Sequence, residues 1–342
     1  MLTRSALLQP TIDLLSGAER AAFVAARWRE QFAYIERHRV AYWQARFRDH
    51  RVDEHAFDRL PPLTREELRD LSPWAFVPDD VRTQLRRAYG TSGTTGRPLS
   101  FFWTDGDWNA MADTFARMIE RDRPAGEVIA LNGYHQGHVA GQVYHSAIGR
   151  IGGVSIPRHY LFDDEAATLD QLRMFRCNTI ILAERSDLLK NGKTIVALLQ
   201  HSPKFFAELG IRWWLGSTST FTAETRRIAR DQGVTAITNL YGSAEFGALA
   251  VSCRVEPTHY HTAMGHAFVE IVDAQGRHVR SGERGRVVVS LLSSLDARGE
   301  LAPRAGSQLL RIDNSDEATY IDEPCACGLA SPRLHGIARR KR

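Results

Sequence analysis

Residues 89–98 form the stretch of the sequence that is best suited to hold phosphate groups. They read YGTSGTTGRP, with three glycines, three threonines and one serine. Glycine lets a backbone turn tightly, hydroxyl and backbone N–H groups can donate to phosphate oxygens, and Arg97 adds a positive charge. The run is not a Walker A loop, because that motif ends in Gly-Lys-Ser/Thr and opens a helix, whereas Arg97 and Pro98 follow the last glycine here. A flexible linker is the alternative, but a short run between apolar segments favours a phosphate-binding loop.

Two later stretches carry side chains that suit a nucleotide and its metal ion. Residues 239–247, NLYGSAEFG, follow a predicted strand, and open α/β sheets bind ligands at strand ends. Tyr241 offers a flat face for a base, and Glu245 offers a carboxylate for a hard cation such as Mg²⁺. In residues 309–320, LLRIDNSDEATY, Asp316 could accept hydrogen bonds from ribose hydroxyls. Each pattern alone is weak, because Glu245 could be a surface carboxylate and Asp316 a turn former.

A group of cysteines near the C-terminal end suggests a metal site. Cys325 and Cys327 are separated by one residue, so both thiolates can reach one ion. Cys253, with His259 or His261 a few residues on, could supply two more ligands. Three sulfurs and one imidazole suit a closed, structural zinc site. Spacing leaves both histidines open, and free buried cysteines are the alternative.

Alternating strands and helices must position these residues. Amphipathic helical segments separate the apolar, strand-like segments 127–131, 153–157, 178–182, 211–215 and 234–240. This alternation predicts an α/β fold with a layered, mostly parallel sheet. From residue 251 the sequence becomes β-rich. We therefore predict α/β nucleotide- and acid-binding subdomains over residues 1–250 and a β-rich subdomain over residues 251–342.

Several helices are also predicted with their ends. Residues 18–49 repeat apolar residues at helical spacing and predict an amphipathic helix. Thr64, with Glu67 three residues on, predicts a capping box at the start of a short helix. A helix over residues 220–232 is expected to begin near Thr222.

Composition limits the classes of partner. The chain of 342 residues has 43% hydrophobic and 25% charged residues, as an ordinary globular protein does. The net charge of only +4 and a basic tail of four residues give little support for nucleic-acid binding. No window offers the ~18 consecutive apolar residues of a membrane span. The N-terminus lacks the apolar core of a secretory signal, which predicts a reducing, cytoplasmic location.

Together, in this order and spacing, these stretches resemble the adenylate-forming superfamily of acyl-CoA ligases, adenylation domains and luciferases. The phosphate loop is the most specific element, and the phenylacetate–CoA ligase branch is the most similar. The resemblance covers nearly the whole chain, through YWQARF, LPPLTREELRD, YGTSGTTGRP, YGSAEFG, GERGRVVVS, LLRIDNSD and CACGLASPRLHGIAR. It implies the fold of the large N-terminal domain of such an enzyme.

The resemblance also implies a role for individual residues. Tyr241 and Gly242 would bind adenine, Asp316 the ribose and Glu245 the Mg²⁺ ion, while Arg339 would match the arginine before the family's hinge. Comparison with the branch favours His261 over His259 as the zinc ligand. The loop would hold the β- and γ-phosphates of ATP through Thr91, Ser92, Gly93, Thr94, Thr95, Gly96 and Arg97.

The sequence departs from the family pattern at several positions. Arg97 replaces a lysine, which keeps the charge but changes its geometry. Ala244 replaces a threonine, and Asn314-Ser315-Asp316 replaces Thr-Gly-Asp. The family continues past the hinge into a mobile C-terminal domain that carries a lysine used in adenylation, and we expect that domain to be absent here. A separate C-terminal-domain-like partner, or a local cation such as Arg97 or Arg339, would then replace that lysine.

The expected activity is ATP-dependent adenylation of a small carboxylic acid, with transfer of the acyl group to CoA, a carrier protein or an amine. The resemblance places the acid pocket around residues 132–146 and 216–220, with Tyr134, His135, His138 and Gly216 as candidate contacts. Aromatic and polar side chains there suggest a small aromatic or polar acid. The alternative is a regulatory or scaffold protein that binds a nucleotide without turnover. The expected cofactors are ATP, Mg²⁺ and structural Zn²⁺, with no nucleic acid and no membrane as partner.

Overall fold

The computed structural model describes residues 10–91, 98–134, 137, 139–157, 165–184, 204–217, 221–296 and 298–340. It contains two compact units, which we describe separately. The first unit comprises Met1–Thr114, Ser243–Leu249 and His259–Arg342, and the second comprises Phe115–Gly242 and Ala250–Thr258. No described helix is both long and apolar enough to cross a membrane.

The second unit is built on a parallel sheet. Its strands are β3 (Ile129–Asn132), β4 (Val154–Pro157), β5 (Thr179–Ile181), β6 (Trp213–Ser217) and β7 (Ala236–Ser243). They lie in the order β4-β3-β5-β6-β7, and every neighbouring pair is parallel. The predicted α/β alternation is therefore confirmed. The order reverses at β3, because β4 lies on one side of it and β5 on the other; such a switch point is where open α/β sheets bind ligands.

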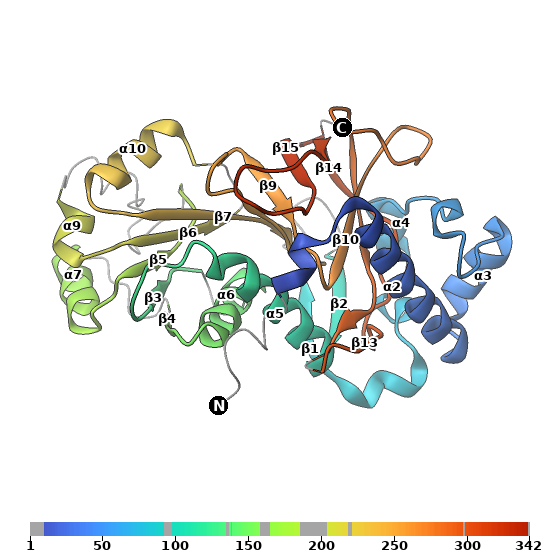
Figure 1. The fold of residues 1–342 in the computed structure, drawn as a ribbon. Helices are drawn as coiled ribbons and strands as arrows, with labels where there is room; N and C mark the ends of the chain where they lie inside the picture. Colours follow the sequence, from blue (N-terminus) through green and yellow to red (C-terminus); the bar gives the residue numbers. More distant parts are fainter. Residues whose placement is uncertain are drawn as a thin grey trace. The chain divides into compact units, whose positions relative to one another are not determined.

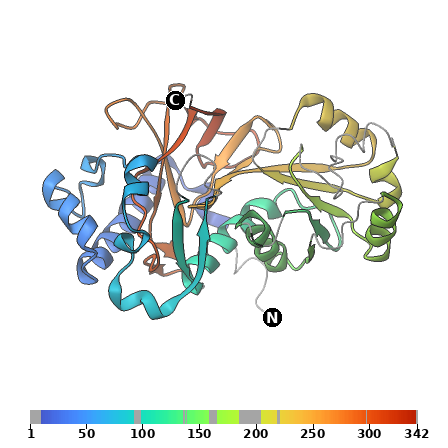
Figure 2. The same cartoon turned by 180° about the vertical axis from the view of Figure 1, so that it is seen from behind.

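Helices cover both faces of this parallel sheet. They are α6 (Val139–Arg150), α7 (Glu165–Met174), α9 (Phe205–Leu209) and α10 (Ala223–Asp231). Figure 1 shows α10 on one side of the strands and α6 on the other, and Figure 2 shows the same arrangement from behind. All five residues of β6 are buried, as expected for a strand that is covered on both faces. The core beneath α10 includes Phe206, Trp214 and Phe221.

The first unit contains an antiparallel sheet with N-terminal helices. Its strands lie in the order β10 (Ala267–Val272), β11 (Arg284–Leu291), β14 (Ile312–Ile321), β15 (Arg333–Arg339) and β9 (His259–Thr262). A separate hairpin joins β1 (Leu85–Gly90) to β2 (Ser100–Thr104). The helices are α2 (Gly17–Arg37), α3 (Ala41–His50) and α4 (Arg65–Asp70).

The remaining elements are short or run between the units. Helix α5 (Asp105–Glu120) and strand β8 (Gly247–Ser252) include residues of both units. Strands β12 (Ser294–Leu295) and β13 (Leu301–Ala302) form a small hairpin. Four 3-10 turns span Pro10–Leu14, Phe57–Arg59, Pro73–Phe76 and Asp79–Gln84.

The first 114 residues group with the C-terminal strands, a grouping that differs from the predicted boundary at residue 250. Hydrogen bonds between residues that are distant in sequence explain this grouping. The Trp43 indole donates to the carbonyl of Gln308 at 2.8 Å, and the Arg27 guanidinium donates to the carbonyl of Ser293 at 2.6 Å. Leu63 also pairs with the strand residue Ile312.

The predicted helix ends are partly confirmed. Thr64 and Glu67 form the capping box of α4, and Thr222 is the N-cap of α10. The helix predicted over residues 18–49 is wrong as one element, because it divides into α2 and α3. Arg39 between them adopts a left-handed φ of 52°, which a continuing helix does not allow.

Candidate active site

The predicted phosphate loop joins the two strands of the β1–β2 hairpin. Ser92, Gly93, Thr94, Thr95, Gly96 and Arg97 lie outside the described residues. The two ends of the loop are joined by hydrogen bonds: the Thr91 amide donates to the Leu99 carbonyl at 2.9 Å, and the Leu99 amide donates to the Thr91 hydroxyl at 3.1 Å. Thr91 therefore closes the neck of the loop, and its hydroxyl hydrogen remains a donor.

Glu245 is buried in the first unit and is paired with an arginine that the sequence analysis did not single out. The Arg65 guanidinium lies 2.5 Å from a carboxylate oxygen of Glu245, whose side chain is only 1% exposed. The contact is an ion pair without hydrogen-bond geometry, since neither carboxylate oxygen accepts a hydrogen bond in the described part of the chain. Arg65 is the first residue of α4. The capping box formed by Thr64 and Glu67 holds the start of this helix and thereby positions the Arg65 backbone.

Arg65 also connects Glu245 to the residues predicted to bind ribose. The same guanidinium nitrogen of Arg65 donates to the side-chain oxygen of Asn314 at 3.1 Å. The Asn314 amide donates in turn to Asp316 at 2.9 Å. Arg339 donates to the other carboxylate oxygen of Asp316 at 3.3 Å and to the Asn314 carbonyl at 3.0 Å. Three predicted site residues, Glu245, Asp316 and Arg339, thus belong to one chain of polar contacts.

The contacts of the turn at 313–316 show how Ser315 is accommodated at a position where the family has glycine. Ser315 stands where the family has glycine, and its φ is 62°, in the left-handed region that glycine adopts most easily. Its amide donates to the carboxylate of Asp313 at 2.8 Å. Asp313 also pairs with Arg286 at 3.4 Å and Arg340 at 3.0 Å. These contacts hold a serine in a backbone conformation that serine rarely adopts.

The side chain of Glu245 fits the predicted magnesium ion. Mg²⁺ takes oxygen ligands, commonly one or two carboxylates together with phosphate oxygens and water. Both Glu245 oxygens are buried without a hydrogen bond from the described residues, so their lone pairs can meet a cation. Arg65 supplies positive charge at this carboxylate in the structure, and a metal would have to share it with Arg65 or displace Arg65.

In the second unit, aromatic residues and a glycine meet at the carboxyl ends of β3 and β6. The amide and hydroxyl of Ser217 contact the Tyr134 hydroxyl at 3.0 and 2.7 Å, and the Tyr144 hydroxyl donates to the Gly216 carbonyl at 2.6 Å. The two tyrosine rings are stacked, 5.8 Å apart and nearly parallel. Burial raises the pKa of Tyr134, so its phenol stays protonated through the neutral range.

Gly216 is needed for space at this site. A Cβ added there would lie 2.6 Å from the Phe221 ring, closer than real Cβ contacts allow. The structure thus brings together two predicted contacts of the acid, Tyr134 and Gly216, through Tyr144 and Ser217, which lie within the predicted ranges 132–146 and 216–220 but were not singled out. His135 and His138 lie outside the described residues.

Tyr241 and Gly242 lie within the last residues of β7, which extends to Ser243, beyond the predicted strand end at 240. Both are partly exposed. Their strand is parallel to β6, so they lie at the same edge of the sheet as Gly216 and Ser217. Glu184, near the end of β5, is buried and accepts hydrogen bonds from the Thr222 amide and hydroxyl at 3.1 and 2.9 Å. It therefore holds Thr222, the N-cap residue of α10, in place.

Three of the predicted zinc ligands lie together in the first unit. The ligand atoms of His261, Cys325 and Cys327 are all within 4.8 Å of one another, and His261 Nε2 is 3.2 Å from the Cys327 sulfur. His261 Nδ1 is 3.1 Å from the Ser331 carbonyl, the kind of contact that orients a metal-binding imidazole. His259 instead stacks on His335 at 4.5 Å. The donor set of three sulfurs and one imidazole nitrogen fits a closed tetrahedral zinc site.

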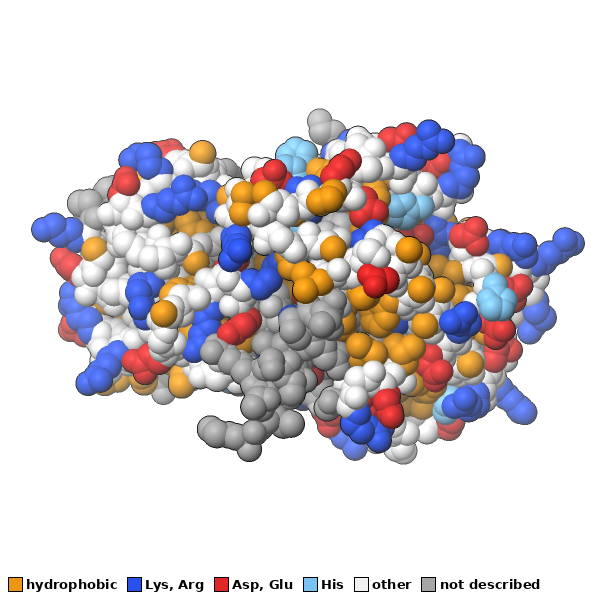
Figure 3. Space-filling model, viewed as in Figure 1, with side chains coloured by type: hydrophobic (Ala, Val, Ile, Leu, Met, Phe, Trp, Pro, Cys, Tyr) orange, Lys and Arg blue, Asp and Glu red, His pale blue; other side chains and the backbone are white. Residues whose placement is uncertain are grey.

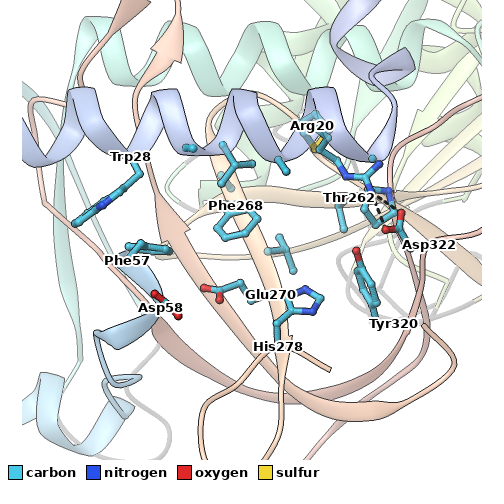
Figure 4. Close-up of a pocket in the computed structure, with 18 of the residues that line it drawn as sticks. Arg20, Trp28, Phe57, Asp58, Thr262, Phe268, Glu270, His278, Tyr320 and Asp322 are labelled. Atoms are coloured by element: carbon cyan, nitrogen blue, oxygen red, sulfur yellow. Dashed lines mark hydrogen bonds and ion pairs between the residues drawn. The ribbon is translucent and has the colours of Figure 1, made fainter. Parts of the chain in front are cut away.

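A different cavity, of about 520 Å³, lies beneath α2 in the first unit (Figure 4). Its walls include the apolar side chains of Trp28 and Phe268. Arg20 and Asp322 at one end form an ion pair at 2.6 Å. Glu270 pairs with Arg311 at 3.2 Å, and burial raises the pKa of the Glu270 carboxyl although Arg311 opposes this shift. Because these charged groups already have partners, we assign no nucleotide chemistry to this cavity.

Comparison with known proteins supports an assignment of the fold. No protein-family profile matches the chain. A curated relative, the phenylacetate-coenzyme A ligase of Thermus thermophilus, is 24% identical over 347 residues, which cover 98% of this chain and 73% of the relative.

Solved structures of other proteins have a similar fold. A 2-hydroxyisobutyryl-CoA ligase in complex with 2-HIB-AMP and CoA has a TM-score of 0.77 at 16% identity, covering 97% of this chain and 77% of that one. VinN has a TM-score of 0.52 at 14% identity and covers 73% of this chain and 60% of its own. The chain therefore has the fold of the adenylate-forming enzymes, and its sequence is similar to that of a phenylacetate-coenzyme A ligase.

Proposed function

We propose that this chain is an ATP-dependent acid–CoA ligase that forms an acyl-adenylate from a small carboxylic acid. The observation that carries the proposal is the chain of contacts from Glu245 through Arg65 and Asn314 to Asp316 and Arg339. It links the residue proposed for Mg²⁺ to the residue proposed for ribose. The similarity to a phenylacetate-coenzyme A ligase supports CoA as the acceptor.

In the proposed reaction, a carboxylate oxygen of the acid attacks the α-phosphorus of ATP and pyrophosphate leaves. Mg²⁺, when bound at Glu245, would neutralise charge that develops on the phosphates. The residues of this chain position the reactants and stabilise charge, and no protein nucleophile is required. Asp316 would accept hydrogen bonds from the ribose hydroxyls, and Arg339 would orient its carboxylate.

For the acid, we propose the carboxyl ends of β3 and β6 as the binding region. Tyr134 and Gly216 would line it, together with His135 and His138 from the segment that follows β3. Gly216 leaves room beside the Phe221 ring, and the Tyr134 hydroxyl is a polar group among aromatic rings. This combination suits a small aromatic or polar acid better than a long aliphatic chain.

The test is ATP–pyrophosphate exchange with a panel of small aromatic and polar acids. We expect acid-dependent exchange by the native chain and at least a hundredfold loss in Glu245→Gln. Glu270→Gln is a matched control, because it also neutralises a buried carboxylate that is paired with an arginine in the first unit. Exchange that survives in Glu245→Gln would contradict the proposed magnesium role.

The second candidate is a regulatory protein that binds a nucleotide without turnover. Ala244, which lacks the hydroxyl that the family has next to Glu245, favours this candidate. Tight ATP or AMP binding together with no exchange for any acid would support it and overturn the ligase proposal.

We also propose a structural zinc ion at Cys253, His261, Cys325 and Cys327, in a cytoplasmic protein whose cysteines stay reduced; none of the four cysteines forms a disulfide in the structure. Elemental analysis should find about one zinc per chain, since such a site contributes directly to folding. Cys325→Ser should lose the metal and lower the unfolding temperature. Cys177→Ser, which changes a buried cysteine in the core of the second unit, should keep the metal.

A further inference from the structure

A small basic cavity lies in the second unit, at the opposite end of the sheet from the proposed acid site. Its volume is about 230 Å³, and its wall includes Val234 and Thr235, which precede β7, and Ala236, the first residue of β7. Tyr241 lies five residues further along the same strand, or roughly 16 Å at ~3.3 Å per residue. The cavity is therefore separate from the carboxyl ends of the strands.

Four arginines from three parts of the chain line this cavity. Arg121 follows α5, Arg226 and Arg230 lie on α10, and Arg254 follows β8. Arg226 and Arg230 are four residues apart, which places them on one face of α10, where like charges repel each other. Lys and Arg side chains are also visible over the region of α10 in Figure 3.

Among the described residues that line the same cavity, one is acidic. Asp122 accepts a hydrogen bond from the Thr238 hydroxyl at 2.8 Å. Burial raises the pKa of its carboxyl, whereas Arg121 and Arg254 oppose this shift. Within the described lining of the cavity, one carboxylate therefore accompanies four guanidinium groups, an excess of positive charge.

The arginines differ in how they are held. Arg226 is only 8% exposed, and its guanidinium lies over the Phe221 ring at 5.5 Å. Arg230 and Arg254 are exposed, and neither forms an ion pair with any residue that the structure describes. The neighbouring Arg227, in contrast, pairs with Asp231 at 3.0 Å and is not part of the cavity wall.

We propose that this cavity binds a phosphate group, either as free phosphate or as the phosphate of a larger molecule such as CoA. Guanidinium groups match tetrahedral oxyanions through paired N–H donors, and several arginines can surround one anion. A cavity of about 230 Å³ is smaller than the ~300–1,000 Å³ typical of sites for whole small molecules. It therefore suits one phosphate group, with the rest of any larger ligand outside.

The test is calorimetric titration of the full chain with inorganic phosphate at low ionic strength. We expect binding by the native chain, a loss of at least tenfold in affinity for the double variant Arg230→Ala/Arg254→Ala, and no change in Arg227→Ala. Sulfate should compete and acetate should not, because only sulfate shares the tetrahedral shape. Equal phosphate affinity in all three proteins, or no binding by the native chain at millimolar phosphate, would overturn the proposal.

Two further measurements identify the source of the phosphate and exclude misfolding. If the ligand is CoA, then CoA should bind more tightly than CoA without its 3′-phosphate, and the double variant should remove that difference. If the ligand is free phosphate, the two forms should bind alike while the double variant still loses inorganic phosphate. The unfolding temperature of the unliganded double variant should not fall, because two like charges are removed; a large fall together with lost binding would count against a specific site.

Discussion

Arg65 contacts Glu245 at 2.5 Å and Asn314 at 3.1 Å through the same guanidinium nitrogen. This arginine comes from the first residue of a short helix, whereas Asn314 comes from a turn almost 250 residues later. The pairing of Leu63 with Ile312 in the first unit brings the two segments together. Arg65 is therefore the residue that connects the proposed metal-binding carboxylate to the proposed ribose-binding turn.

The first prediction concerns this pair. Arg65→Ala should destabilise the chain by about 3–5 kcal/mol at pH 7, because it leaves a carboxylate buried without its partner. Urea unfolding measures the free energy of unfolding. The double variant Arg65→Ala/Glu245→Gln should recover part of the loss, and Mg²⁺ should stabilise Arg65→Ala more than the native chain. Additive losses in the double variant would show that the two side chains are not coupled.

The second prediction concerns the turn at Ser315. Because its φ of 62° favours glycine, Ser315→Gly should stabilise the chain by about 0.5–1 kcal/mol, after allowing for the greater freedom of glycine in the unfolded chain. Ser315→Val should destabilise it, since a β-branched residue tolerates this conformation poorly. The free energies of unfolding of the two variants check this. A destabilised Ser315→Gly would mean that the serine side chain contributes more than the backbone strain costs.

The third prediction separates two stacked tyrosines. Tyr134→Phe should raise the KM for the acid several-fold with a smaller effect on kcat, because it removes the hydroxyl that contacts Ser217. Tyr144→Phe should instead lower stability by about 0.5–1.5 kcal/mol, because it removes the buried hydrogen bond from the Tyr144 hydroxyl to the Gly216 carbonyl. Steady-state kinetics and urea unfolding of both variants measure this contrast. Equal effects on KM would place both hydroxyls in the same role.

The fourth prediction concerns alkaline pH. Burial raises the pKa of the Cys177 thiol from 9.0 to about 12. The unfolded chain therefore loses this proton at lower pH than the folded chain does. The contribution of the protonated thiol to the free energy of unfolding is complete below pH 9. It is lost as the pH rises towards 12, at up to about 1.4 kcal/mol per pH unit.

Cys177→Ala should therefore flatten the fall in unfolding free energy between pH 9 and pH 12. The pH dependence of the native chain and the variant, measured by urea unfolding, checks this. Identical slopes would show that the thiol titrates alike in the folded and unfolded chains.

The sequence by itself determined the class of fold and most of the types of residue at the site. Strands 127–131, 178–182, 211–215 and 234–240 were predictable because buried parallel strands are short, apolar and separated by helices. The capping box at Thr64 was predictable because it depends on residues only three positions apart. The cysteine and histidine residues were predictable as a group because zinc sites use these two types of side chain at short spacings.

Only the tertiary structure decided which distant residues meet. Arg65 carries no motif, and its contact with Glu245 depends on the pairing of Leu63 with Ile312 of β14. The contacts of Tyr144 with Gly216 and of Ser217 with Tyr134 could not be predicted for the same reason, because they form only when α6 packs on the sheet and parallel strands bring their carboxyl ends to one edge. The four arginines of the basic cavity come from three separated segments, so their shared charge does not appear in any sequence window. Local patterns encode elements, whereas contacts between elements depend on packing over the whole unit.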